Sequence, residues 1–224
     1  MFIVDNVSKI YSGPHSSIHA LDDVSVTIER GSFVAVTGGS GSGKTTLLLT
    51  LGGLIRPSAG SISYEGRNVY SLPEPALAEY RNKNVGFVLQ TFNLIPYLTA
   101  LENVMLPMIF NGDRNGNAME FAPRLLDKVG LGERRDHLPR ELSVGEQQRV
   151  AIARALANDP DVILADEPTG NLDPNLSLEI LNILKNLNES EGRTIIMVTH
   201  SPEAAKFGNR QLHLKDGRIE NQID

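Results

Sequence analysis

The chain has 224 residues, a formal net charge of −6 and no cysteine. This length suits one compact unit, and the lack of cysteine excludes disulfides, thiolate metal sites and a cysteine nucleophile. The acidic balance gives no basic stripe, so nucleic acid is not expected as the main partner. The longest apolar stretches, such as Val104–Phe110, fall far below the roughly 20 residues that span a bilayer. Any membrane role is therefore expected to come through a partner.

The first residues predict a small antiparallel sheet, because Phe2–Val7 and Leu21–Ile28 alternate apolar and polar side chains. Four short, nearly continuous apolar runs then predict strands that are buried on both faces of a parallel sheet. They are Phe33–Thr37, Val85–Leu89, Val162–Ala165 and Ile195–Thr199. Helical patterns lie between some of these runs, so the fold class is α/β. Near the C-terminus, Asp216-Gly217 predicts a closing hairpin.

A phosphate loop follows the first of the buried strands and opens a helix. Glycines let successive N–H groups curl around an anion, Lys44 can reach the β- and γ-phosphates, and the Thr45 hydroxyl can ligate Mg²⁺. The strand–loop–helix setting makes a plain glycine-rich turn a poor alternative. The residues of this candidate nucleotide site are Gly38, Gly39, Ser40, Gly41, Ser42, Gly43, Lys44, Thr45 and Thr46.

An inserted helical lobe is expected over about residues 92–157, which hold helical signals and no convincing strand. Thr99 and Glu102 form the sequence pattern of a capping box, and Phe121–Val129 reads as a second helix that ends at Gly130.

A second capping box is predicted by Ser143 and Glu146, just before an apolar helical run. A helix N-terminus offers unpaired N–H groups and partial positive charge, so it is also a natural seat for a phosphate. Gly145 lets the backbone approach a ligand closely. Taken alone, this pattern is usually only a capping device.

Two carboxylates, Asp166 and Glu167, end the strand Val162–Ala165, at the edge where open α/β sheets bind ligands. Asp166 suits the Mg²⁺ shell, and Glu167 suits polarising an attacking water. Such a pair is most often a solvated loop start, but its combination with a phosphate loop favours the functional reading. Helix starts are predicted at Asp173-Pro174 and Ser201-Pro202.

Three further residues are weak signals on their own. Gln90 follows a strand and can reach Mg²⁺ and water, although a lone loop glutamine is most often solvated. His200 follows another strand and can contact the γ-phosphate, although such a histidine can simply bond a carbonyl or water. Tyr11 can stack on adenine, although a lone tyrosine is more often packing.

The order of these motifs resembles that of the ATP-binding cassette (ABC) ATPases over nearly the whole chain. The series runs from Tyr11 through the phosphate loop, Gln90, the signature run Leu142–Arg149, Asp166-Glu167 and the turn Asn171–Asp173 to His200. The resemblance implies a RecA-like P-loop core, an N-terminal antiparallel β subdomain and a helical subdomain within a single nucleotide-binding domain of residues 1–224.

The resemblance also implies roles for these residues. Two ATP molecules with Mg²⁺ would lie between two head-to-tail subunits of a homodimer. Glu167 would be the general base, His200 the γ-phosphate sensor, and Thr45, Gln90 and Asp166 the metal-site residues. The other subunit would complete each site with Ser143, Val144, Gly145, Glu146 and Asp173.

A finer resemblance, to the macrolide-exporter, lipoprotein-release and cell-division ATPases of prokaryotes, comes from Phe92–Pro96, Leu101–Val104, Glu146–Gln148 and Ala165–Asp173. It implies a separate permease with few membrane helices that docks near Phe92–Leu106. The chain would then be cytoplasmic and attached peripherally to the cell membrane.

One departure is that the family usually has Gly where this chain has Val144. A β-branched residue cannot readily adopt φ > 0, so we expect an active ATPase for which Val144 is at most a mild handicap.

Three other functions remain open at this level. Regulation of a cell-envelope enzyme cannot be separated from export, because that choice lies in the permease. A DNA-processing ABC ATPase is less favoured, because such heads are split by long coiled coils and no sustained heptad run occurs here. A translation-associated ABC protein is also less favoured, because it would carry two cassettes in one chain, whereas this chain has one phosphate loop and one signature run.

Overall fold

The computed structural model describes residues 1–13, 16–112 and 117–223. Its main sheet has the strand order β10-β9-β3-β8-β7-β6, and all neighbours are parallel except the C-terminal pair β9 and β10. The strands are β3 (Phe33–Thr37), β6 (Val85–Val88), β7 (Val162–Asp166), β8 (Thr194–Val198), β9 (Arg210–Lys215) and β10 (Arg218–Ile223).

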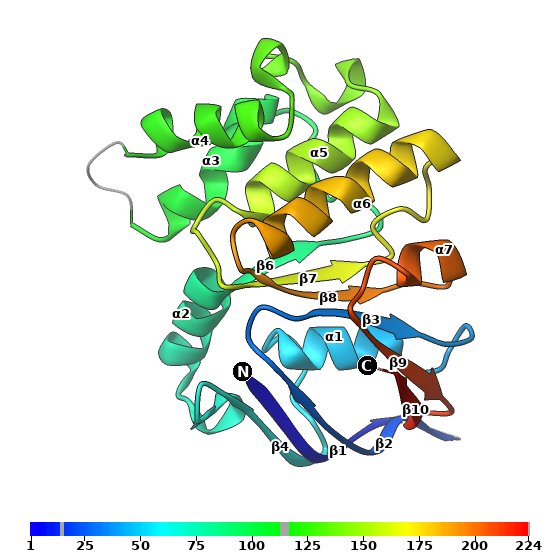
Figure 1. Ribbon diagram of the computed structural model, residues 1–224. Coiled ribbons are helices and arrows are strands. Elements are labelled where there is room, and N and C mark those ends of the chain that lie inside the picture. Colours follow the sequence, from blue (N-terminus) through cyan, green and yellow to red (C-terminus); the bar gives the residue numbers. More distant parts are fainter. Residues whose placement is uncertain (14–15, 113–116, 224) are drawn as a thin grey trace.

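A second, antiparallel sheet has the order β2-β1-β4-β5. It is built from β1 (Phe2–Ser12), β2 (Ser17–Ile28), β4 (Ala59–Tyr64) and β5 (Arg67–Asn68). Figure 1 shows α1 (Lys44–Leu51) between this sheet and the main sheet. The phosphate loop, which precedes α1, therefore lies where the two sheets meet.

Helices cover the other face of the main sheet (Figure 1). Those on the chain between β6 and β7 are α3 (Ala100–Phe110), α4 (Asn117–Lys128) and α5 (Val144–Ala155), together with the 3₁₀ turns η2 (Gly132–Arg134) and η3 (Pro139–Glu141). The remaining elements are η1 (Val69–Ser71), α2 (Glu74–Asn84), α6 (Pro174–Glu189) and α7 (Pro202–Ala205).

The main sheet separates two hydrophobic cores, because successive side chains of a strand point to opposite faces. On β3, Val34 and Val36 pack with α1 and the antiparallel sheet. Phe33 and Ala35 pack with the helices of the opposite face. Burial on both faces explains the continuous apolar runs in the sequence.

The predicted strands of the main sheet are confirmed to within one residue at each end, and both capping boxes are present, at Thr99 and Ser143. The antiparallel sheet is larger than the alternation predicted, because β1 and β2 are longer and β4 and β5 complete it. Helix α4 begins at Asn117, before the predicted Phe121. Among the described residues from 92 to 157 there is no strand, as expected.

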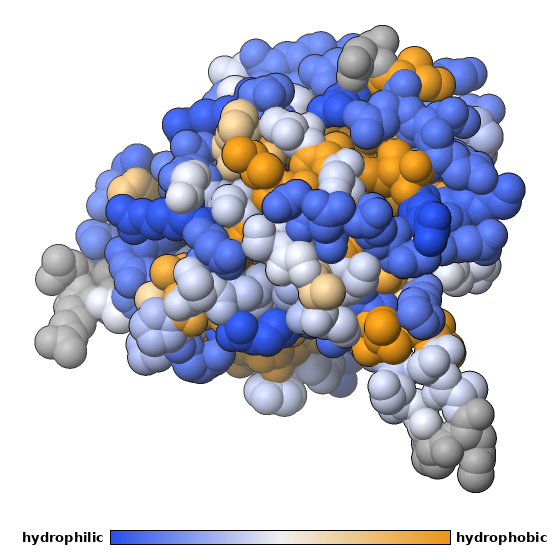
Figure 2. Space-filling model, turned by 90° about the horizontal axis from the view of Figure 1, so that it is seen from below, coloured by the Kyte–Doolittle hydropathy of each residue, from blue (hydrophilic) through white to orange (hydrophobic). Residues whose placement is uncertain are grey.

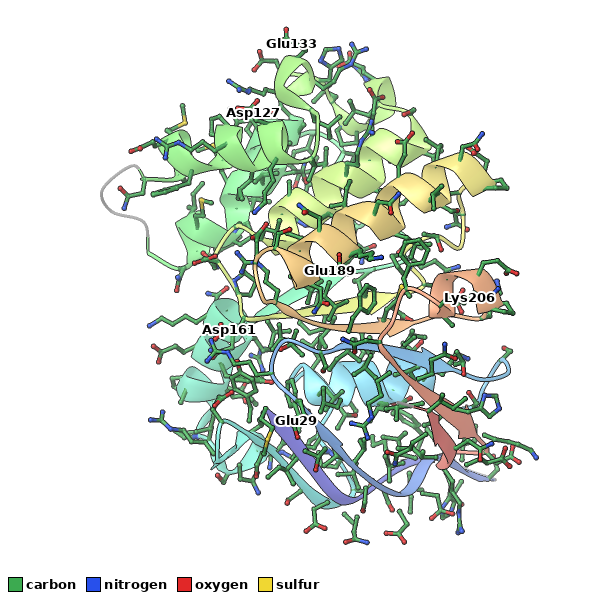
Figure 3. All side chains as sticks on the ribbon, in the orientation of Figure 1. Glu29, Asp127, Glu133, Asp161, Glu189 and Lys206 are labelled. Carbon is green, nitrogen blue, oxygen red and sulfur yellow. The ribbon has the colours of Figure 1, made fainter. Side chains whose placement is uncertain are left out.

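Two residues labelled in Figure 3 mark the two ends of the parallel strands. Asp161, which precedes β7, lies on the side where the strands begin, and Lys206, after α7, lies on the side where they end. Figure 2, viewed from the side of the antiparallel sheet, shows a largely hydrophilic surface with apolar patches between. No helix in the described part of the chain is long and apolar enough to cross a membrane.

Candidate functional site

The phosphate loop connects β3 to α1. Helix α1 starts at Lys44 after Gly43, which has φ 101° and provides no capping side chain, and its first turn holds no acidic residue. The first N–H groups of a helix have no partner within the helix, and the helix dipole is positive there. This helix start therefore favours an anion as its cap.

Lys44 places its cation inside the loop. Its side chain is only 7% exposed, and Nζ donates to the carbonyl oxygens of Gly38 at 3.0 Å and Gly39 at 2.7 Å. The Ser42 hydroxyl lies 3.5 Å away. The loop thus holds a nearly buried ammonium with carbonyl partners and no carboxylate, an arrangement that suits a phosphate.

Asp166, at the end of β7, meets the first turn of α1. The Thr45 hydroxyl donates to Asp166 Oδ1 at 3.1 Å. Burial raises the pKa of the Asp166 carboxyl and the nearby Glu167 charge adds to this, while the Thr45 hydrogen bond and the Lys44 charge oppose it. Two hard oxygen donors side by side fit Mg²⁺. The described residues contain no cluster of three or more His, Cys, Asp or Glu that could hold a metal.

Glu167 and His200 join the ends of two adjacent strands. His200 Nδ1 lies 2.7 Å from Glu167 Oε2, and a protonated Nδ1 donates to a carboxylate at this distance. Glu167 has φ 46°, an uncommon value for a residue with a side chain. Its backbone N–H donates to Val198 O at 2.9 Å, which ties the residue to β8. Strain of this kind clusters at functional sites.

Gln90 reaches the same place from β6. A methyl group added at Gly170 would lie 3.1 Å from Gln90 Nε2 and 3.2 Å from Glu167 Oε2, so this amide and this carboxylate approach a common point. Asn171 Nδ2 also donates to Gln90 O at 3.2 Å. The ends of β6, β7 and β8 thus bring Gln90, Glu167 and His200 together.

A hollow of about 530 Å³ lies over the phosphate loop. Sequence reasoning found most of its lining but missed Ile18 and Ala20 of β2. Ile18 pairs across the sheet with Tyr11 and is 64% exposed, so the two form an apolar ledge at one side. The lining residues are Tyr11, Ile18, Ala20, Ser40, Gly41, Ser42, Gly43, Lys44, Thr45, Thr46, Glu167 and His200.

The predicted residues that do not line this hollow fall into two groups. Gly38, Gly39 and Asp166 accept hydrogen bonds from the lining residues Lys44 and Thr45, and Gln90 approaches Glu167 beside Gly170. Ser143, Val144, Gly145, Glu146 and Asp173 are also absent from the lining. A single chain therefore does not bring the signature residues to its own phosphate loop.

The signature residues form the predicted capping box at the start of α5. Ser143 Oγ accepts from the Glu146 N–H at 3.3 Å, and Glu146 Oε2 accepts from the Ser143 N–H at 2.8 Å. This backbone hydrogen bond holds the pKa of Glu146 below its ordinary value. Arg134 Nε lies 3.3 Å from the other oxygen of Glu146. The Glu146 carboxylate thus caps its own helix.

Val144 is the first residue of α5, has no positive φ and is 45% exposed. The backbone at this position is helical, so it does not require the positive φ that only glycine adopts readily. For a ligand at this helix start, Val144 differs from glycine in the bulk of its exposed side chain.

The start of α5 packs on the start of α6. A methyl group at Gly145 would lie 3.0 Å from a Leu176 methyl carbon. Asp173 caps α6 by accepting from the N–H groups of Asn175 at 2.9 Å and Leu176 at 3.2 Å. Gln148 is fully buried and donates to Pro168 O at 2.7 Å. Helix α5 is thereby fixed to the loop that follows Glu167.

The other end of α5 holds the segment after Gln90. Arg154 donates to Asn93 O at 2.5 Å and Phe92 O at 2.6 Å. Phe92 and Asn93 have φ of 42° and 48°, so both are in the left-handed region. No carboxylate of the described residues pairs with Arg154, and burial lowers the pKa of its guanidinium. This half-buried cation was not singled out from the sequence, where it is one of the two arginines of α5.

Comparison with known proteins agrees with this geometry. A family model described as ABC transporter matches residues 21–170. The chain is 45% identical over 219 residues to the lipoprotein-releasing system ATP-binding protein LolD of Syntrophus aciditrophicus, covering 98% of each chain. It is 46% identical over 221 residues to the macrolide export ATP-binding/permease protein MacB of Syntrophobacter fumaroxidans, covering 97% of this chain and 31% of that protein.

Among solved structures, a dimeric, post-hydrolysis state of the ATP-binding cassette MJ0796 bound to ADP and Pi has a TM-score of 0.92 and 42% identity. The match covers 100% of this chain and 98% of that one.

Proposed function

Because this chain belongs to the ABC transporter ATP-binding family, we propose that it powers a separate membrane permease by closing as a dimer on ATP and opening after hydrolysis. The chain is an ABC ATPase, and its nucleotide is ATP. The proposal depends on one observation, which is that the signature residues lie apart from the phosphate loop of their own chain. The phosphate loop, Glu167 and His200 share one hollow, whereas Ser143 to Glu146 lie outside it.

The first part of the proposal concerns hydrolysis. Loop N–H groups and Lys44 would hold the β- and γ-phosphates, Glu167 would accept a proton from the attacking water, and His200 would contact the γ-phosphate. No covalent intermediate is needed, because positioning and electrostatic stabilisation support in-line attack. Thr45, Asp166 and Gln90 would hold Mg²⁺, which when bound neutralises phosphate charge. Support comes from the Thr45–Asp166 hydrogen bond and the common approach of Gln90 and Glu167.

The second part concerns dimer closure. The helix start at Ser143 has the positive end of a helix dipole and further N–H groups beyond those of the capping box, and it does not line the hollow over its own chain's phosphate loop. In a head-to-tail pair, Ser143, Val144 and Gly145 of one subunit would face the γ-phosphate of the other, with Glu146 and Asp173 beside them. ATP would then hold the two subunits together, and the permease would change conformation as the dimer closes and opens.

The third part concerns the permease. A groove of about 310 Å³ adjoins the Phe92–Leu106 segment at Pro107, the residue that follows it, and at Arg154, which donates to Phe92 O and Asn93 O. Its lining also includes Phe87, Leu89 and Leu54, and Leu54 is 52% exposed. Such a groove suits a short amphipathic helix. We propose that a permease with few membrane helices docks here and holds the chain at the cytoplasmic face of the membrane.

Affinity capture from detergent-solubilised membranes of the source cell, with the tagged wild-type chain and MgATP, tests the permease. We expect an integral membrane protein to be recovered by wild type and lost with Leu54→Asp. Ile223→Asp changes an apolar residue of 63% exposure on β10 and should keep the partner. Recovery of DNA in place of any membrane protein would overturn the proposal.

A further inference from the structure

The turn between β9 and β10 lies against the back of the phosphate loop. The Gly217 N–H donates to Ser42 O at 3.1 Å, and Gly217 O accepts from the Asp22 N–H at 2.9 Å. One residue of the hairpin thus bridges the phosphate loop and β2. Neither Gly217 nor Asp22 lines the hollow over the loop, so this contact is on the outer side.

The hydrogen bond to Ser42 has a consequence for Gly43. The Ser42 carbonyl and the Gly43 N–H belong to one planar trans peptide, so they point in opposite directions. When the carbonyl is held toward Gly217, the Gly43 N–H is turned away from the hairpin. Gly43 lines the hollow, and it precedes the uncapped start of α1. The outer contact therefore sets the direction of an N–H group at the anion seat.

Strand β9 supports the other end of the loop in the same way. A methyl group at Gly38 would lie 2.1 Å from Leu214 O, so the two backbones are in close contact. One residue earlier, the Thr37 hydroxyl lies 3.4 Å from Leu212 O and 3.1 Å from His213 Nδ1. Both ends of the phosphate loop thus rest on the C-terminal hairpin.

The turn itself is well defined. Asp216 has φ 47° and Gly217 has φ 78°, the pattern of a type I′ hairpin turn. A methyl group at Gly217 would lie 3.1 Å from Ala20 O and 3.2 Å from His19 O. Arg218 also donates to Asp22 Oδ2, from Nε at 2.9 Å and from the terminal nitrogen at 2.7 Å. The turn therefore has a fixed place beside β2.

We propose that Gly217 is a positioning residue for the nucleotide. It orients the Ser42–Gly43 peptide for phosphate and so raises the affinity for ATP without touching ATP. The proposal rests on the phosphate loop being the nucleotide site. The hairpin lies beyond residues 21–170, the part matched by the family model, so the match itself does not point to it.

The test compares Gly217→Ala with a matched change at Gly66. Glu65 and Gly66 form the β4–β5 turn with φ of 47° and 76°, nearly the same backbone, but nothing lies within 4 Å of a methyl group at Gly66. Both substitutions place alanine in the left-handed region, at a similar local cost. Only the methyl group at Gly217 would crowd the β2 backbone, so only this change is expected to shift the turn and its N–H relative to Ser42.

We expect Gly217→Ala to raise the Kd for ATP, measured by calorimetry, by about fivefold, the size of one lost hydrogen bond. The KM for ATP should rise with it and kcat should change little, because no reacting group moves. Gly66→Ala should keep the wild-type Kd. Equal Kd values for the two variants would overturn the proposal.

A second pair covers the case in which Gly217→Ala fails to fold. Arg218→Ala removes the tie to Asp22, and Lys215→Ala removes an ion pair to Glu220 of 3.1 Å within the hairpin. We expect a higher Kd for ATP only with Arg218→Ala, and Arg218→Lys should partly restore it. Equal values would again overturn the proposal. Wild type that binds no ATP, and so does not differ from Lys44→Ala, would instead overturn the nucleotide site on which the proposal depends.

Discussion

His200 Nδ1 lies 2.7 Å from Glu167 Oε2, so the proposed sensor and the proposed base are in direct contact across the ends of β8 and β7. The Glu167 side chain is 22% exposed and that of His200 is 65% exposed. The base is thus the better shielded of the two, and the histidine can reach into the hollow. A γ-phosphate that engages His200 would compete with Glu167 for it.

The first prediction concerns Glu167→Gln. We expect kcat for ATP hydrolysis to fall by about 10²–10⁴-fold, the usual worth of a general base, while ATP remains bound and the dimer accumulates. Steady-state ATPase assays and size-exclusion chromatography with MgATP measure the two effects. Glu203→Gln, on α7, is the control and should retain turnover. Unchanged turnover in Glu167→Gln would remove Glu167 from the role of base.

The second prediction concerns the division of each site between subunits. Ser143→Ala should lower ATPase activity and cost about 1 kcal/mol of stability through the lost cap. Asn68→Ala removes the cap of η1, where Asn68 accepts from the Tyr70 and Ser71 N–H groups, and should change only stability.

Mixing Ser143→Ala with Glu167→Gln sharpens this test. In a head-to-tail pair, one site of the mixed dimer carries both defects and the other carries none. Activity above the mean of the two separate variants is therefore expected. No gain would place Ser143 at its own chain's site or leave it as a helix cap only.

The third prediction concerns Val144→Gly. The helical backbone at this position makes no demand for glycine, so the substitution changes only side-chain bulk and helix propensity. We expect equal or faster turnover, with a stability loss of up to about 1 kcal/mol from the lower helix propensity of glycine. ATPase assays and thermal unfolding measure both. A clear loss of ATPase activity would show that Val144 contributes to the site.

The fourth prediction concerns pH and Asp166. Because the fold raises the pKa of this carboxyl, chiefly by burial, the native state binds its proton more tightly than the unfolded chain does. The stabilisation from the protonated group is present below the unfolded pKa and is lost as pH rises through the folded pKa. Asp166→Asn should therefore raise the Tm of the nucleotide-free chain at neutral pH.

That gain in Tm should shrink as pH falls toward 3.8, the ordinary pKa of the group, and the variant should lose most of the stabilisation that MgATP gives. Differential scanning fluorimetry across pH, with and without MgATP, measures this. A lower Tm for Asp166→Asn at neutral pH would mean that the ionised carboxylate stabilises the empty site.

The fifth prediction concerns Arg154→Met, which removes the donors that hold Phe92 O and Asn93 O. We expect kcat to fall several-fold with a similar KM, because Gln90 lies just before this segment. Hydrogen bonds from charged groups contribute about 1.5–3 kcal/mol each, so denaturant unfolding should also show a lower stability. Arg154→Lys should restore part of both.

Arg124→Met, which removes an exposed ion pair with Glu120 on α4, is the control for Arg154→Met. Equal kcat values for the two variants would contradict the idea that Arg154, by holding Phe92 O and Asn93 O, keeps Gln90 in position.

Local patterns in the sequence predicted the chemistry well, because the relevant signals lie within a few residues of each other. The phosphate loop, the Ser143 capping box and the carboxylates after Val162–Ala165 are of this kind. Contacts between distant segments could not be predicted, since nothing in the chain near Ser42 points to Gly217. The ledge of Tyr11 and Ile18 was missed for a similar reason, because it depends on the pairing of β1 with β2.

Helix α5 is held at three points along its 12 residues, a length of about 18 Å at the usual rise per residue. Its start follows Ser143 and packs on Leu176, its buried Gln148 donates to Pro168 O, and Arg154 near its end donates to the backbone of Phe92 and Asn93, beside the proposed permease groove. Because one continuous helix joins these contacts, a displacement of its start would also be carried to the backbone at Phe92 and Asn93.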